Sequence, residues 1–320
     1  MPSSIRSVDA QPQPQPQPVL SPPAPVAVFL VVTIEPGGED AVRDLLSGLA
    51  GLVRAVGFPS PDGGLCCVTG VGSAAWDRLF GDPRPRDLHP FRELEGRRHR
   101  AVSTPGDLLF HIRAARTDLC FALVTEIMKR LRDAVTVQDE VQAFAYFDSR
   151  NLLGFVDGTE NPVGQAAAEA AIVGAEDPAF AGGSYAVVQK YVHDVEAWEA
   201  LAVEAQEKVI GRSKLTNIEL DVPGSHKDVN TVTGPDGEEL EILRGAMPFG
   251  RPGHGEFGTY FIAYARTPAI PETMMRKMFL GGPESGPDPI LDYSQAVTGT
   301  LFFIPSVTFL DSIPERPVAD

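Results

Sequence analysis

The sequence has few of the residues that build covalent or locally encoded metal frameworks. It contains only three cysteines, Cys66, Cys67 and Cys120, and two of these are adjacent in the chain. An odd number of cysteines without metal-type spacing predicts free thiols and a reduced, cytoplasmic compartment. His-Glu-x-x-His and Cys-x-x-Cys motifs are absent as well, which excludes the common local zinc sites.

Positive charge is also scarce. Lys plus Arg is 27 against 43 for Asp plus Glu, so the formal net charge is -16. Without a basic run to neutralise phosphates, the chain is not expected to bind nucleic acid or anionic membranes. No run of eighteen or more apolar residues is present, so no membrane span is predicted.

The N-terminal segment is dominated by proline. Gln-Pro repeats from Gln11 to Pro18 and Ser21-Pro22-Pro23 follows. Because alternating prolines prevent helices and strand ladders, residues 1–25 are predicted to form a disordered tail, with a polyproline ligand for an SH3-type module as the alternative.

From Val26 onward, apolar periodicity predicts alternating strands and helices. Strands are expected at 26–34, 65–71, 107–115, 140–147, 184–193, 257–265 and 299–305, and helices at 39–56, 76–80, 118–131, 195–210 and 271–280. The element order repeats, which predicts an α+β protein of two ferredoxin-like domains, each an antiparallel sheet with packed helices. The predicted domains span 26–150 and 151–312, followed by a C-terminal tail at 313–320. The polar stretch 211–255 is expected to be a functional or mobile loop.

The stretch Asn151–Pro162 fits neither strand nor helix periodicity. Glycines flank a single acid, in Gly154 and then Asp157-Gly158, before Thr-Glu-Asn-Pro ends the segment. Such glycines let the backbone approach a flat ligand closely and direct one carboxylate toward it. The segment is therefore predicted to cover a cofactor pocket.

Two further residues stand out in the polar stretch. His226 follows Pro-Gly-Ser, and a loop imidazole is free to act as an axial metal ligand, although a surface histidine is the simpler interpretation of this residue alone. Arg244 lies between an apolar approach and the run Gly-Ala-Met-Pro-Phe-Gly, which favours a fixed cation beside a pocket wall. An ordinary ion-pair partner is the alternative.

Together these segments resemble the dye-decolourising peroxidases, specifically the bacterial B-type branch. The family signature Gly-x-x-Asp-Gly stands here as Gly154-Phe155-Val156-Asp157-Gly158, and the similarity extends over roughly residues 26–309. The resemblance implies a non-covalent haem b held mainly by the second domain. It also implies that hydrogen peroxide is reduced through a ferryl intermediate, with one-electron oxidation of small organic donors such as dyes or phenolics.

The resemblance also implies roles for individual residues. His226 matches the proximal iron ligand, and Asp292 is expected to accept the hydrogen bond of its other ring nitrogen. Asp157 and Arg244 match the distal pair, one to move a proton and the other to stabilise the departing oxygen. Contacts with the cofactor are expected from Gly158, Thr159, Glu160, Asn161, Phe261 and Met278, with ordinary core packing as the alternative for the last two.

One position departs from the family pattern. Ala246 stands where the family usually has asparagine, so an amide beside Asp157 is replaced by a methyl group. Haem binding is expected to survive, whereas the distal hydrogen bonds are expected to change. The resemblance further implies a homo-oligomer, as a dimer or hexamer, and the tail at 311–320 predicts no encapsulation. The competing hypotheses are a haem-handling protein that stores or delivers haem, and a non-haem binding module.

Overall fold

The first half of the chain forms a four-stranded sheet with two long helices. The computed structural model describes residues 14–158, 160–282 and 286–314. The elements of the first half are β1 (Val26–Ile34), α1 (Glu39–Gly57), β2 (Cys66–Gly72), α2 (Ser73–Leu79), β3 (Leu94–Glu95), β4 (Arg100–Ala101), β5 (Leu108–Ala114), α3 (Thr117–Leu131) and β6 (Val135–Phe144). The short strands β3 and β4 pair separately as a small two-stranded sheet.

The second half repeats this plan with more interruptions. Its elements are α4 (Gln165–Ala171), β7 (Ser184–His193), α5 (Val195–Glu199), α6 (Val203–Ile210), α7 (His226–Asn230), β8 (Leu243–Arg244), β9 (Met247–Arg251), β10 (Glu256–Ala265), α8 (Ala269–Leu280), β11 (Ser294–Ala296), β12 (Thr300–Ile304) and α9 (Val307–Leu310). Short 3₁₀ turns occur at Pro18–Leu20, Pro61–Gly63, Arg132–Ala134, Pro178–Phe180, Pro252–His254 and Pro289–Asp292.

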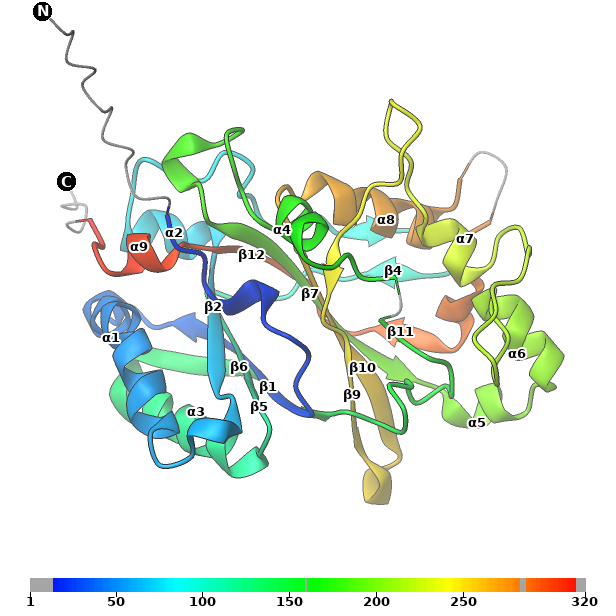
Figure 1. Cartoon of the computed structure of the whole chain (residues 1–320), viewed down its shortest axis with the longest axis horizontal. Coiled ribbons are helices and arrows are strands. Elements are labelled where there is room, and N and C mark those ends of the chain that lie inside the picture. Colours follow the sequence, from blue (N-terminus) through cyan, green and yellow to red (C-terminus); the bar gives the residue numbers. More distant parts are fainter. Residues whose placement is uncertain (1–13, 159, 283–285, 315–320) are drawn as a thin grey trace, which may run out of the picture.

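Strand order confirms the predicted fold class. The first half runs β6-β1-β5-β2 and the second runs β12-β7-β10-β8, with every pairing antiparallel. Each half therefore places its fourth, first, third and second strands side by side, which is the order of a ferredoxin-like domain. The two sheets join through β2 and β12, so the described residues form one continuous ten-stranded sheet (Figure 1).

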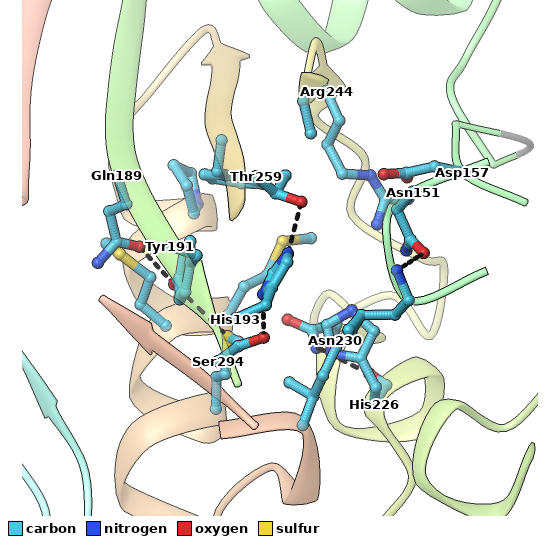
Figure 2. A pocket seen from close by; sticks show the side chains of 18 of the residues that line it. Asn151, Asp157, Gln189, Tyr191, His193, His226, Asn230, Arg244, Thr259 and Ser294 are labelled. Carbon is cyan, nitrogen blue, oxygen red and sulfur yellow. Dashed lines mark hydrogen bonds between the residues drawn. The ribbon is translucent and has the colours of Figure 1, made fainter. Parts of the chain in front are cut away.

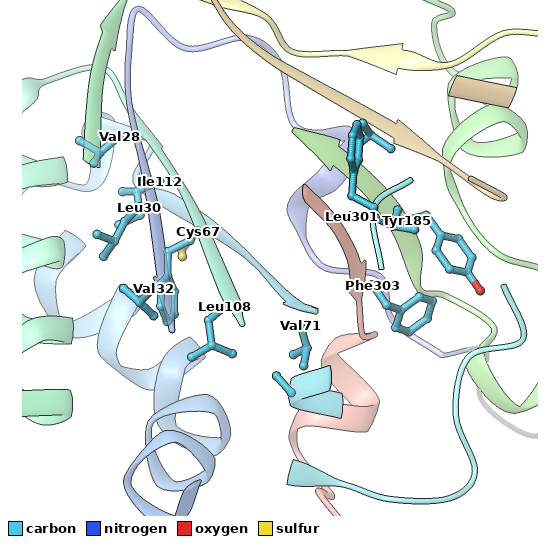
Figure 3. Close-up of a cluster of buried hydrophobic side chains, with 14 of the residues drawn as sticks. Val28, Leu30, Val32, Cys67, Val71, Leu108, Ile112, Tyr185, Leu301 and Phe303 are labelled. Carbon is cyan, nitrogen blue, oxygen red and sulfur yellow. The ribbon is translucent and has the colours of Figure 1, made fainter. Parts of the chain in front are cut away.

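Strand β1 is apolar at every position except Thr33, because both of its faces are largely buried. Val28, Leu30 and Val32 lie on the face that packs with the helices, as Figure 3 shows. Phe29 and Val31, on the opposite face, pack in a second core. This division explains why the sequence shows a continuous apolar run rather than alternation.

The second core lies between the two halves. It combines Phe29 and Val31 of β1 with Tyr260, Ile262 and Tyr264 of β10. The halves are thus held by face-to-face packing of sheet surfaces as well as by the β2–β12 pairing. β6 also lies against β9, so the sheet curls around this core.

The join between the sheets requires a glycine. A Cβ added to Gly70 of β2 would lie 2.8 Å from the side chains of both Phe302 and Ile304. Any larger residue at this position would push β12 away from β2.

Three element predictions need correction. The fourth strand spans Val135–Phe144 instead of 140–147, and the helix expected at 195–210 is divided into α5 and α6. The division occurs where the Gln206 side chain donates to the Trp198 carbonyl oxygen at 2.8 Å, which satisfies a carbonyl at the end of α5. The stretch 211–255, expected as a loop, contains α7, β8 and β9, whose short lengths leave little periodicity to detect.

The predicted disordered tail is wrong for residues 14–25, whereas residues 1–13 lie outside the described part of the chain. Gln17 is buried, and its side chain binds both halves of the fold. Its Nε2 donates to the carbonyl oxygens of Thr69 at 2.9 Å and Pro305 at 2.8 Å, and its Oε1 accepts from the Thr69 backbone N–H at 2.8 Å. A proline-rich composition did not reveal this single amide contact.

Among residues 14–158, 160–282 and 286–314, no helix is both long and apolar enough to cross a membrane.

We expect Gln17→Ala to lower the free energy of unfolding by roughly 2 kcal/mol or more, because three backbone groups would lose buried partners. Gln15→Ala is the matched control, since Gln15 is exposed and the hydrogen bonds seen for it use only its backbone. Urea denaturation of both variants checks this, and equal midpoints would contradict it.

Candidate active site

The segment after β6 forms a tight loop that places Asp157. Asn151 holds the turn, because its Oδ1 accepts from the backbone N–H groups of Leu153 and Phe155, both at 3.1 Å. Gly154 has a φ of 88°, and a Cβ there would meet Lys214 Cε at 2.7 Å, so the turn requires glycine. The loop then continues to Asp157, whose N–H donates to the Ser149 carbonyl oxygen at 2.8 Å.

This loop borders two adjoining cavities in the second half. The inner chamber has a volume of about 920 Å³, part of which is open to solvent, and its walls are largely apolar, including Phe261 and Met278. The outer cavity has a volume of about 880 Å³, also partly open to solvent, and is more polar, with Glu160 and Arg212 in its wall. Both cavities are lined by Asn151, Asp157, His226, Asn230, Ile242, Arg244, Met274 and Ile290. They therefore form one continuous site.

His226 begins the short helix α7 and is fixed by a buried carboxylate. Its Nδ1 is 2.6 Å from Asp288 Oδ2, and Asp288 is fully buried. Asn230 supports the pair, since its Nδ2 donates to Asp288 Oδ2 at 3.0 Å and to the His226 carbonyl oxygen at 2.7 Å. With Nδ1 engaged in this way, Nε2 is the ring nitrogen left for a ligand.

The prediction that Asp292 accepts the hydrogen bond of His226 is wrong. Asp292 instead pairs with Arg98 at 2.8 Å and with His99 at 2.9 Å, at another cavity. Asp288 and Asp292 lie at opposite ends of the 3₁₀ turn Pro289–Asp292, where Asp288 caps the turn through Ile290 N–H. Sequence proximity did not distinguish two aspartates four residues apart, because the turn buries Asp288 against His226 and directs Asp292 to another cavity.

The carboxylate of Asp288 controls the charge on His226. Burial by itself disfavours the imidazolium, but the charge of Asp288 and its hydrogen bond outweigh this and raise the pKa of His226 above its ordinary value. Arg244 lowers and Asp157 raises the same pKa to a smaller extent. Both distal residues are therefore close enough to His226 to act on its charge.

Arg244 ends β8 at a break in the second strand of this half. Arg244 pairs with Ala263 and Met247 pairs with Tyr260, so β8 and β9 share one register along β10. At the break, Gly245 N–H still donates to the Ile262 carbonyl oxygen at 2.8 Å. The arginine is thus held by a strand although it stands at the edge of a cavity.

Asn161 fixes the backbone of Arg244. Its Nδ2 donates to the Arg244 carbonyl oxygen at 2.7 Å, and its Oδ1 accepts from the Arg244 N–H at 2.9 Å. This two-way contact joins the Asp157 loop to β8 and so sets the separation of the two distal residues. Figure 2 shows Arg244 and Asp157 at one end of the pocket, with His226 and Asn230 at the other.

The distal side chains keep free hydrogen-bonding capacity. Within the described part of the chain, Arg244 Nε is buried without a hydrogen-bond partner, and Arg244 Nη2 is 3.7 Å from Glu160 Oε2. The Asp157 carboxylate accepts from the Gly158 N–H at 2.8 Å. Ala246 lines the inner chamber as a methyl group and offers neither residue a partner.

The remaining predicted contact residues are distributed over both cavities. Phe261 and Met278 line the inner chamber, whereas Gly158 and Glu160 line the outer cavity. Thr159 lies outside the described residues. Their contacts with a cofactor stay predictions.

Sequence reasoning missed the polar wall opposite Asp157. Gln189, Tyr191 and His193 of β7 line the chamber together with Thr259 of β10 and Ser294 of β11. The signal was present, because these three β7 residues alternate along the strand and must share one face.

Comparison with known proteins defines the class of this site. The family description "Dyp-type peroxidase, N-terminal" matches residues 16–145, and "Dyp-type peroxidase, C-terminal" matches residues 148–309. The chain is therefore an oxidoreductase of the peroxidase class. Within that class it belongs to the Dyp-type peroxidase family.

Its relatives cover nearly the whole chain. A dye-decolorizing peroxidase of Mycobacterium tuberculosis is 56% identical over 314 residues, which are 97% of this chain and 94% of the relative. The encapsulated DyP-type peroxidase of Mycobacterium smegmatis is 55% identical with a TM-score of 0.94, covering 95% of this chain and 100% of that one. A variant of Rhodococcus jostii DypB in which leucine replaces an arginine, in complex with heme, is 52% identical with a TM-score of 0.92. The match covers 95% of this chain and 100% of that one.

A more distant relative has a different name. A deferrochelatase of Escherichia coli (strain K12) is 27% identical over 203 residues, which are 58% of this chain and 48% of the relative.

We expect Asp288→Asn to lower the pKa of His226, because burial would then act without the opposing carboxylate charge. Asp292→Asn is the control, since Asp292 pairs with residues of another cavity. NMR titration of the unloaded protein measures the pKa, and equal shifts in both variants would rule out Asp288 as the controlling group.

Proposed function

We propose that this peroxidase binds haem b non-covalently, with His226 as the proximal ligand, and reduces hydrogen peroxide while oxidising organic donors such as dyes or phenolics. The observation that carries the proposal is the arrangement of His226–Asp288 on one side of a chamber and Asp157–Arg244 on the other. The relatives support it, because a DypB structure of high similarity contains heme.

The residues fit such a group in their chemistry. The chamber walls include Phe261 and Met278, which suit an apolar ring, and the chamber and outer cavity adjoin. Asp288 orients the imidazole and increases its basicity, as a carboxylate does for metal-bound histidines. Arg244 lines both cavities, so its guanidinium borders the space that a bound ligand would occupy.

The chain's own groups supply acid–base chemistry and charge. When bound, haem would supply the electrons that split the peroxide O–O bond and would accept replacement electrons one at a time from organic donors. Asp157 is placed to take a proton from one peroxide oxygen and return it to the other. The guanidinium of Arg244, which stays charged, stabilises negative charge on the departing oxygen.

Compartment and oligomeric state are part of the same proposal. We infer a cytoplasmic homo-oligomer, either a dimer or a hexamer, and the three free cysteines support a reduced compartment. The expectation of no encapsulation concerns residues 311–320, of which 315–320 lie outside the described structure. The absence of encapsulation stays a prediction, and the similar peroxidase of Mycobacterium smegmatis is an encapsulated one.

His226→Ala is expected to abolish haem binding, seen as loss of the Soret absorption band after haem is added to the purified protein. His254→Ala is the control, because His254 is an exposed histidine in a surface turn. A wild-type protein without a Soret band, or a His226→Ala protein that keeps it, would refute the assignment.

Arg244→Ala is expected to slow the reaction with peroxide by about 100-fold or more, and Asp157→Ala by a smaller factor. The reason is that Ala246 leaves Asp157 without a side-chain amide, so Arg244 carries more of the stabilisation. Stopped-flow absorption after mixing with peroxide measures both rates.

Arg251→Ala provides the control for this series, since Arg251 lies on β9 and pairs with Glu256 at the surface. Equal rate losses for Arg244→Ala and Asp157→Ala would contradict the ranking. A wild-type protein that binds haem but reacts slowly with peroxide would favour the haem-handling alternative.

A further inference from the structure

A buried histidine bridges two hydroxyl groups on the wall of the chamber. His193 Nε2 is 2.9 Å from Thr259 Oγ1, and His193 Nδ1 is 2.6 Å from Ser294 Oγ. His193 is 7% exposed and Ser294 is 5% exposed, so bulk water competes little for these hydrogen bonds. Figure 2 shows the imidazole lying between the two hydroxyls.

This wall separates the chamber from a different cavity. Thr259 lines the chamber, whereas His193 and Ser294 line both the chamber and a second cavity, which has a volume of about 1170 Å³ and is partly open to solvent. The second cavity is also lined by Arg98, His99, Arg100, Asp194, Asp292 and Tyr293. The Ser294 end of the hydroxyl–imidazole–hydroxyl chain thus borders both cavities, and the Thr259 end borders the chamber.

The ring is neutral and has a partner on each nitrogen. Burial lowers the pKa of His193 to about 4, so the ring carries one proton near neutral pH. A neutral imidazole donates from one nitrogen and accepts at the other, and a hydroxyl does both. His226 differs, because its Nδ1 is held by a carboxylate that fixes the position of its proton.

We propose that Ser294, His193 and Thr259 form a proton relay from the second cavity into the chamber. The relay rests on the proposed peroxidase function, because reduction of one peroxide to two waters consumes two electrons and two protons. A donor too large for the chamber supplies electrons from outside, so the matching protons must arrive by another route. Asp157 redistributes protons within the peroxide but does not supply new ones.

Each transfer conserves atoms and charge. The Ser294 hydroxyl gives its proton to His193 Nδ1, and Nε2–H gives its proton to Thr259 Oγ1. Thr259 releases its own hydroxyl proton into the chamber, and a hydronium ion in the second cavity reprotonates Ser294 and becomes water. The imidazole ends in its other tautomer and must return to the first tautomer before the next transfer. A working relay therefore requires that both tautomers be populated.

The first measurement uses the protein without haem. Nitrogen NMR shifts of the His193 ring are expected to lie between the values for protonated and bare nitrogens, because the two tautomers exchange. A single fixed tautomer would overturn the relay, whatever the outcome for the proposed function.

The second measurement compares His193→Gln with wild type in the haem-loaded protein. An amide can keep both hydrogen bonds but does not pass a proton, so turnover of a sulfonated anthraquinone dye is expected to fall at least about tenfold. The solvent deuterium isotope effect is expected to rise, while the stopped-flow rate of the first reaction with peroxide stays within about twofold of wild type, because that step uses Asp157. His99→Gln is the matched control, since His99 lines the same cavity and pairs with Asp292.

Dye turnover within about twofold of wild type and an unchanged isotope effect would overturn the relay. A loss of turnover that accompanies a lower melting temperature and lower haem content would show a structural role instead, and would also overturn it. Failure of the wild-type protein to bind haem would refute the proposed function, whereas the NMR result would still decide whether the ring exchanges tautomers.

Discussion

The site depends on an interruption in one strand that is held in register. β8 and β9 pair with β10 as though they were one strand, yet they are separated by Gly245 and Ala246 at the chamber. Gly245 keeps its backbone hydrogen bond to Ile262, so the gap does not loosen the sheet. Arg244 is consequently held as rigidly as a strand residue, yet its side chain lines the cavities as a loop residue could. Asn161 extends that rigidity to the loop that carries Asp157.

The same constraint separates the two halves in function. In the first half, β2 is the strand that corresponds to β8 and β9, and it is continuous from Cys66 to Gly72. Its edge is occupied by β12 and by the amide of Gln17 instead of a cavity. Duplication of the fold thus produced one half that holds the site and one half that supports it. The shared core between β1 and β10 joins them.

The chamber is largely apolar and is lined by few charged side chains. The chain carries a net charge of -16, yet few ionisable groups line the chamber. Asp288 balances His226 across a 2.6 Å contact, and burial keeps His193 neutral. In a region of low polarity such contacts shift protonation far more than they do at the surface. The chemistry of the chamber therefore depends on a few fixed partners.

Much of the outline was predictable from the sequence. The apolar run Val26–Ile34 and the spacing of Val42, Leu45 and Leu49 follow directly from burial, and the structure confirms a strand and a helix there. The loop at Asp157 was recognisable because glycines next to one acid have a local conformational cause. Short elements escaped prediction, as β8 with two residues shows, because periodicity needs length to be detected.

What the sequence determined was the set of local conformations and the identity of the reactive groups. The tertiary structure alone decided which of those groups meet. Asp288 binds His226 and Asp292 does not, because a 3₁₀ turn buries Asp288 against His226 and directs Asp292 toward Arg98 and His99. Likewise, Thr259 and Ser294 reach the two nitrogens of His193 only because β10 and β11 both pair with β7. Pairings between distant segments arise from packing of the whole chain, and no local pattern specifies them.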